Sequence, residues 1–136
     1  MNTERGSITI WALGLSMLLF GTGFLALDLW SAFATRSELA AIADSAAIAG
    51  GSAIDETAWR NGTLQLQPDE AAHRAETAAR THPRWTDDMT ITTNATTSNI
   101  EVTITQTVPF RFLAALVGDQ AANIAISAQV APGERP

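Results

Sequence analysis

An uninterrupted apolar stretch near the N-terminus constrains this chain more than any other feature. Residues 8–30 contain a single ionisable side chain, Asp28. As an α-helix rising about 1.5 Å per residue, this stretch would cover about 34 Å, and the hydrocarbon core of a bilayer is roughly 30 Å thick. Trp11 and Trp30 lie close to its two ends, where aromatic rings favour the membrane interface. We therefore expect residues 8–30 to form one transmembrane span.

The charges on either side of the span predict its orientation. Arg5 and the amino terminus precede it, whereas the first cation downstream is Arg36. Cytoplasmic flanks of membrane helices carry the excess of basic residues, so residues 1–6 should stay in the cytoplasm. This predicts a single-pass protein of the cytoplasmic (inner) membrane, with an extracytoplasmic domain at residues 51–131.

A cleaved signal peptide is the alternative to an anchor. Ala32, Phe33 and Ala34 resemble a small-x-small cleavage site, and cleavage after Ala34 would release a secreted soluble binding module. The apolar region of a signal peptide runs for about 7–15 residues, and the present stretch is longer. Its length favours the uncleaved anchor, and the mature N-terminus (Met1 or Thr35) distinguishes the two.

Three residues within the span are candidates for helix packing or assembly. Asp28 lies about 13.5 Å along the helix from the middle of the span, which places it near the interface. It is either a carboxylate that reaches water or a buried contact to a neighbouring subunit. Gly14 and Gly21 lie about two helical turns apart, and small residues at such spacing allow two helices to approach closely in lipid.

The helix is predicted to continue beyond the membrane. Residues 31–49 contain no Pro or Gly and are rich in Ala, the best helix former. Gly50 and Gly51 should end the helix, because Gly readily takes the left-handed conformation found at helix ends. We thus predict one helix over residues 7–50.

Two apolar strips run along the water-side part of this helix. Both strips could cover the chain's own sheet, or one could pack on a partner helix. The first strip comprises Ala32, Thr35, Leu39, Ile42, Ala46 and Ala49, and the second comprises Ala40, Ala43, Ala47 and Gly50.

The distal part of the chain is predicted to be α+β. Residues 54–67 read as a loop with a short helical turn, and Pro68, Asp69 and Glu70 open a helix that runs to Arg80. Alternating apolar and Thr residues predict strands at 89–96, 100–108 and 123–130, the first two joined by a hairpin at 97–99. A short helix is expected at 110–117, and a disordered tail at 132–136. The fold class is therefore a long helix packed on a small antiparallel sheet of about three strands.

Composition excludes several functions. The chain has no Cys and no Lys, so it has no thiolate nucleophile and no P-loop. Its net charge of −6 and lack of a basic cluster argue against binding nucleic acid. Glu70, His73 and Glu76 share a helix face that could bind a metal, but an exposed charged face is the simpler interpretation. We predict no enzyme, no cofactor, no metal and no small-molecule substrate.

The N-terminal third resembles TadE/TadG-like proteins, the pilin-like components of the tight-adherence (Flp) pilus assembly system. The matching features are an Arg-Gly-Ser start, an apolar span closing on an Asp, a basic-x-x-Leu stretch and an Ala-Asp-Ala-Ala-rich run. They correspond here to Arg5-Gly6-Ser7, residues 8–29 with Asp28, Arg36-Ser37-Glu38-Leu39 and residues 43–51 with Asp44.

This resemblance implies a pilin-like fold and a non-catalytic role in a pilus or secretion apparatus. The implied partners are other pilin-like subunits, pilus-assembly membrane proteins and the lipid bilayer. Processed members carry Glu at the fifth position after the cleaved Gly, where this chain has Trp11. That departure favours a minor pseudopilin or assembly factor over a major pilin. Asp28 and Asp44 are the family residues that map here, and Ala40 and Ala47 complete the predicted helix-packing set.

Overall fold

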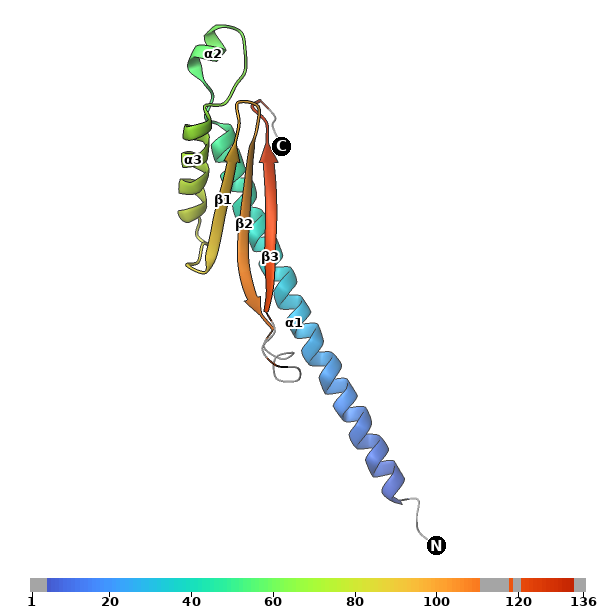
Figure 1. Cartoon of the computed structure of the whole chain (residues 1–136). Helices are drawn as coiled ribbons and strands as arrows, with labels where there is room; N and C mark the ends of the chain where they lie inside the picture. The colour runs from blue at the N-terminus through green and yellow to red at the C-terminus, as the bar shows by residue number, and fades with distance from the viewer. Residues whose placement is uncertain (1–4, 111–117, 119–120, 134–136) are drawn as a thin grey trace. The chain divides into compact units, whose positions relative to one another are not determined.

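The computed structural model describes residues 5–110, 118 and 121–133, and of residues 5–7 only the backbone. The elements, shown in Figure 1, follow in the order α1 (Arg5–Gly51), α2 (Glu56–Arg60), α3 (Pro68–Arg80), β1 (Met89–Ala95), β2 (Ile100–Pro109) and β3 (Ala121–Val130). The predicted α+β fold, a long helix followed by a three-stranded antiparallel sheet, is confirmed. Apart from Phe110, the helix expected at 110–117 lies outside the described residues.

The chain forms two compact units, which we describe separately. The first comprises residues 1–33 with 109–121, and the second comprises residues 34–108 with 122–136. Helix α1 contributes to both, so its stretch up to Phe33 is treated with the first unit and its stretch from Ala34 with the second.

The sheet of the second unit has the order β1-β2-β3. β1 and β2 are antiparallel, with Met89 paired to Gln106 and Ala95 to Ile100. β2 and β3 are linked also by side chains on their outer face, because the hydroxyl groups of Thr103 and Ser127 lie 2.8 Å apart. The alternation that predicted the strands thus separates a Thr-rich outer face from an apolar inner face.

The inner face of the sheet and the two long helices enclose one hydrophobic core. The stretch of α1 from Ala34 passes along the sheet, and α3 lies beside β1 (Figure 1). The buried residues are Leu39, Ile42, Ala43, Ala46 and Ala47 from α1, Ala53 and Leu66 from the following segment, Ala71, Ala75 and Ala79 from α3, and Met89, Ile100, Val102 and Ile104 from the sheet. Members of both predicted apolar strips therefore lie inside the core of their own chain.

The end of α1 falls at the predicted Gly pair, but the predicted reason is wrong. Among the described residues only Gly62, Gly118 and Gly133 have positive φ, so Gly50 and Gly51 are not left-handed. Close packing requires them instead. A Cβ on Gly50 would lie 2.9 Å from the carbonyl oxygen of Ala71 and closer still to Ile100 Cδ1, and one on Gly51 would lie 2.7 Å from Val130 Cγ1.

The chain between α1 and α3 forms a closed loop. An isolated antiparallel bridge joins Ile54 to Leu66 at its base. Within the loop, Asp55 caps the N-terminus of α2, because its Oδ1 accepts hydrogen bonds from the backbone N–H of Thr57 at 2.8 Å and of Ala58 at 3.1 Å. The short helical turn predicted here is α2.

Candidate functional site

The first stretch of α1 presents large apolar side chains that nothing in the described chain covers. Trp11 is 77% exposed, Met17 78% and Trp30 76%. In the described residues, Ile8–Gly51 is the one helix long and apolar enough to cross a membrane. Exposed apolar area of this extent is unfavourable in water and favourable in lipid.

The polar side chains of this stretch bond to their own helix. Ser16 Oγ donates to the carbonyl oxygen of Ala12 at 2.8 Å, and Thr22 Oγ1 donates to that of Leu18 at 3.0 Å. Within hydrocarbon no water is present to satisfy a hydroxyl group, so such intrahelical bonds remove the cost of burying it. These contacts make the surface of the helix compatible with lipid.

The three predicted residues of the span differ in their surroundings. A Cβ added to Gly14 or to Gly21 would meet nothing within 4 Å. Gly14 lines a shallow hollow together with Ile10, Trp11, Leu15 and Leu18. Asp28, in contrast, is buried within the chain at 5% exposure, and it takes part in an interaction. Both glycines are thus accessible to a neighbouring helix, whereas the Asp28 carboxylate is largely covered by its own chain.

The three predicted residues of the second unit also lie in different places. Ala47 is fully buried, Ala40 is half-buried and Asp44 is exposed on the outer side of α1. Ala47 belongs to the hydrophobic core, and one turn further along α1 a Cβ on Gly50 would lie 3.3 Å from Ala75 Cβ of α3. The buried small residues of the two helices are Ala43, Ala46, Ala47 and Gly50 of α1 and Ala71, Ala75 and Ala79 of α3. Asp44 and Asp28 belong to different units.

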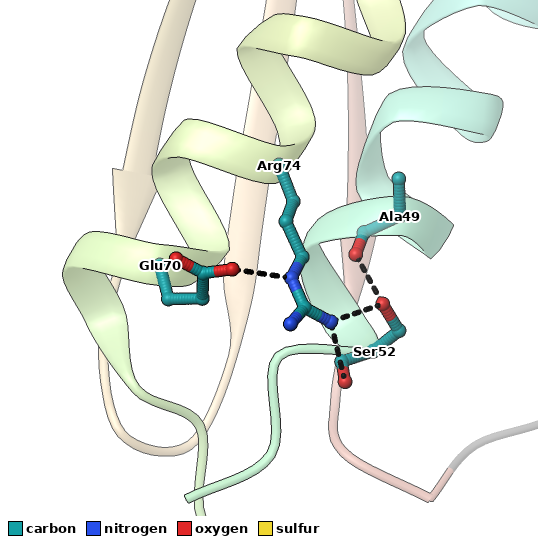
Figure 2. A network of polar contacts seen from close by, with 4 residues as sticks. All are labelled: Ala49, Ser52, Glu70 and Arg74. Carbon is teal, nitrogen blue, oxygen red and sulfur yellow. Dashed lines mark hydrogen bonds and ion pairs between the residues drawn. The ribbon is translucent and has the colours of Figure 1, made fainter.

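A polar network holds the end of α1 against the start of α3 (Figure 2). Arg74 Nε of α3 donates to Glu70 Oε1 at 2.7 Å, and its Nη1 donates to Ser52 Oγ at 3.3 Å and to the Ser52 carbonyl oxygen at 3.4 Å. Ser52 Oγ in turn donates to the carbonyl oxygen of Ala49 at 2.6 Å. The guanidinium thus supplies positive charge at a helix C-terminus that has no basic residue of its own in its last turn.

Sequence reasoning missed this role for Arg74, because the contact joins residues from two separate helices. Glu70, considered with His73 and Glu76 as a possible metal ligand, forms an ion pair with Arg74 instead. Among the described residues, no group of three or more Asp, Glu or His side chains could hold a metal ion.

Sequence reasoning also missed the exposed side chains of the closed loop. Trp59 is 62% exposed on α2, and Ile54 and Leu64 are also exposed. Trp frequently anchors protein interfaces. The loop has no apolar periodicity, so its sequence did not mark these exposed side chains as a contact surface. A Trp in a short polar segment between two helices is the signal that could have identified this surface.

Comparison with known protein families gives a match over a segment that includes most of α1. No curated protein and no solved structure matches the chain. Residues 6–53 match the family model Tad, which is described as putative Flp pilus-assembly TadE/G-like. The resemblance read from the sequence is therefore confirmed over this segment: the chain carries a TadE/G-like, Flp pilus-assembly segment from Gly6 to Ala53.

Proposed function

We propose that this chain is a non-catalytic, membrane-anchored component of a tight-adherence (Flp-type) pilus or secretion apparatus, acting as a minor pseudopilin or assembly factor. The observation that carries the proposal is the exposed apolar surface of α1 within the segment that matches the pilus-assembly family. In this proposal residues 8–30 span the inner membrane, residues 1–6 are cytoplasmic and the second unit is extracytoplasmic.

The length of the apolar region and the continuity of α1 beyond it support an anchor over a secreted module. The predicted cleavage site at Ala32, Phe33 and Ala34 lies within continuous helix. Signal peptidase requires a small-x-small site after a short apolar region. The apolar region here is longer, and its helix continues to Gly51.

Partner contacts are proposed at the accessible positions of α1. Gly14 and Gly21 are open to a second helix in the bilayer, and Asp44 is exposed on the outer side of the second unit. Small residues on a membrane helix permit close contact between backbones, which provides van der Waals attraction where no hydrophobic effect operates between helices. Other pilin-like subunits or assembly proteins are the proposed partners.

Membrane fractionation tests the anchor. We expect the full chain to resist alkaline carbonate extraction, to keep Met1, and to lose its second unit to protease added from the extracytoplasmic side. A soluble product that begins at Thr35 would support the secreted module and contradict the anchor.

Partner contact is tested in the piliated host by Gly14→Leu. The added side chain should reduce piliation while the amount of membrane-inserted protein stays constant. Met17→Leu, which changes an exposed apolar residue for another of similar size, is the matched control. Normal piliation in the Gly14→Leu strain would contradict close helix packing at this position.

A further inference from the structure

The two edges of the sheet differ in what covers them. At one edge α3 packs against β1, and Thr93 Oγ1 donates to Glu76 Oε1 of α3 at 3.5 Å. At the other edge is β3, which is hydrogen-bonded to β2 on one side. Within residues 5–110, 118 and 121–133, no backbone hydrogen bond from another element reaches the outer side of β3. In the part of the chain that the structure describes, the outer backbone groups of β3 therefore form an open edge.

This edge lacks the features that commonly protect an exposed strand. β3 is 10 residues long and has the sequence AANIAISAQV, without charge, Pro or Gly. Natural sheets discourage pairing at their edges with charged side chains, Pro, bulges or very short edge strands. A long, uncharged and regular edge strand is instead a template for another strand.

The side chains of β3 show that the core is incomplete on this side. On β2, the inward residues Ile100, Val102 and Ile104 are 0% exposed. Their counterparts on β3, among them Ile124 and Ile126, are only half-buried, although they face the same core. A further strand with apolar residues at alternate positions would extend the ladder and cover this row.

We propose that the open edge of β3 binds an extended segment of a partner protein by β-strand addition. The segment would need at least about five residues, the length of an ordinary strand, with an apolar side chain at every second position. Its backbone would pair with the outer N–H and C=O groups of β3. Its apolar side chains would continue the inner face beyond Ile124 and Ile126.

A second copy of this chain, paired antiparallel through its own β3, fits the edge less well than a different partner, and this step depends on the proposed membrane anchor. Gly51 lies beside Val130, so the stretch of α1 from Ala34 and β3 run in the same direction (Figure 1). Antiparallel pairing of β3 with β3 of a second copy reverses that direction. The two Ala34 ends would then lie at opposite ends of helical stretches about 25 Å long. One membrane could not hold both anchors.

Disulfide capture tests the proposal, because the chain has no native Cys. Ala125→Cys places a thiol on an exposed residue in the middle of β3, and Thr92→Cys places one on an exposed residue in the middle of β1. Each full-length variant, in phospholipid nanodiscs, is mixed with a synthetic peptide of alternating Val and Thr whose central Cys is activated as its 2-pyridyl disulfide, so that the thiolate of the variant attacks the peptide sulfur and pyridine-2-thione leaves. A second peptide carries Pro on both sides of that Cys.

We expect the first peptide to form a mixed disulfide with Ala125→Cys about tenfold faster than with Thr92→Cys, because strand pairing raises the local concentration of the activated peptide disulfide beside the introduced thiolate on β3. The Pro peptide should react with both variants at the slower rate. Equal rates at the two sites, or no effect of Pro, would overturn the proposal. A disulfide-linked homodimer of Ala125→Cys would also overturn it, in favour of a second copy.

Two further measurements keep the result interpretable. Ser127→Cys, another exposed position on β3, repeats the capture if Ala125→Cys fails to fold. Amide exchange of the unsubstituted chain should slow along β3 when a Cys-free version of the Val/Thr peptide is added, and unchanged exchange would contradict the proposal. Capture does not require a bilayer, so it can be read in detergent even if the chain proves not to be membrane-anchored.

Discussion

The two stretches of α1 are both apolar, yet they use residues of different size. Up to Phe33 the helix displays large side chains such as Leu18 and Phe20, which are 64% and 67% exposed. From Ala34 onward its buried positions are Ala or Gly except for Leu39 and Ile42, which are 0% exposed. Lipid chains adapt to any side chain, whereas a neighbouring helix or sheet of fixed shape demands a fitting one. Residue size along an apolar helix therefore indicates what covers it.

The largest expected effect contrasts one Ile from each stretch. Ile42→Ala should lower the free energy of unfolding of the second unit by about 2–5 kcal/mol, because it leaves a cavity in the core. Ile10→Ala, at a position that is 72% exposed, should leave that unit unchanged. Chemical denaturation of the full chain in detergent measures both values. Similar losses in the two variants would contradict the distinction between the stretches.

A charge in the middle of the first stretch should affect insertion. Leu18→Arg should disfavour the membrane-inserted state by about 2.5–3.5 kcal/mol, the cost of a basic residue at the centre of a span. Glu38→Arg changes an exposed residue in the other stretch and should leave insertion unchanged. The fraction of protein that resists carbonate extraction gives the measurement. Full insertion of Leu18→Arg would mean that residues 8–30 do not lie in hydrocarbon.

Glycine substitutions sharpen the same comparison. Gly50→Ala should destabilise the second unit by about 1–3 kcal/mol, because the added Cβ overpacks the contact with Ala71 and Ile100. Gly23→Ala is the control, since a Cβ there meets nothing within 4 Å. Thermal unfolding followed by circular dichroism should show a lower midpoint for Gly50→Ala alone. Equal midpoints would mean that the packing adjusts around Gly50.

Removal of Arg74, the α3 residue whose guanidinium lies at the end of α1, should have a smaller effect. Arg74→Ala removes the bonds to Ser52 and Glu70 shown in Figure 2, and we expect a loss of about 0.5–1.5 kcal/mol. Arg60→Ala removes an ion pair whose side chains are 74% and 85% exposed, and it should have almost no effect. The same denaturation assay compares them. A larger loss for Arg60→Ala would contradict the role given to Arg74.

The smallest expected effect is on how the stability of the second unit depends on pH in acid. Hydrogen bonds from the side chains of Thr86 and then Gln106 lower the pKa of Asp88, just before β1, below its ordinary value of 3.8. Asp88 therefore adds stability above that value, and this stability is lost as the pH falls through the lowered pKa. Gln106→Ala should reduce the slope of second-unit stability as the pH falls below the ordinary value of 3.8. An unchanged slope would show that this hydrogen bond does not influence the titration.

The sequence predicted the elements of this fold better than their contacts. The period-two alternation located the strands to within two residues, β3 beginning at Ala121 where residue 123 was expected. The contact of Gly50 with Ala71 and Ala75 of α3 could not be predicted, because an Ala-rich strip indicates close packing without identifying the opposite helix. Gly50 was interpreted through backbone conformation, although a contact distant in the sequence is what requires it.

Only part of the candidate site could be predicted, because contacts between residues far apart in the sequence leave no local pattern. The exposed apolar surface of residues 8–30 follows directly from composition. Gly14 and Gly21 are accessible, and their role in helix packing stays a prediction. The contact of Arg74 with Ser52 joins residues that are far apart in the chain, and no local pattern marks it. The burial of Asp28 likewise depends on tertiary structure.

The buried Ala residues of α1 and α3 also limit which sequences can adopt this fold. Ala43, Ala47, Ala71 and Ala75 are each 0% exposed, so a larger side chain at any of them would have to be accommodated inside the core. In the first stretch of α1, exchange among Leu, Ile, Phe and Met keeps the surface apolar and has little effect on packing within the chain. With the proposed anchor, steric tolerance along this one helix changes from broad to narrow where its surroundings change from lipid to the protein core.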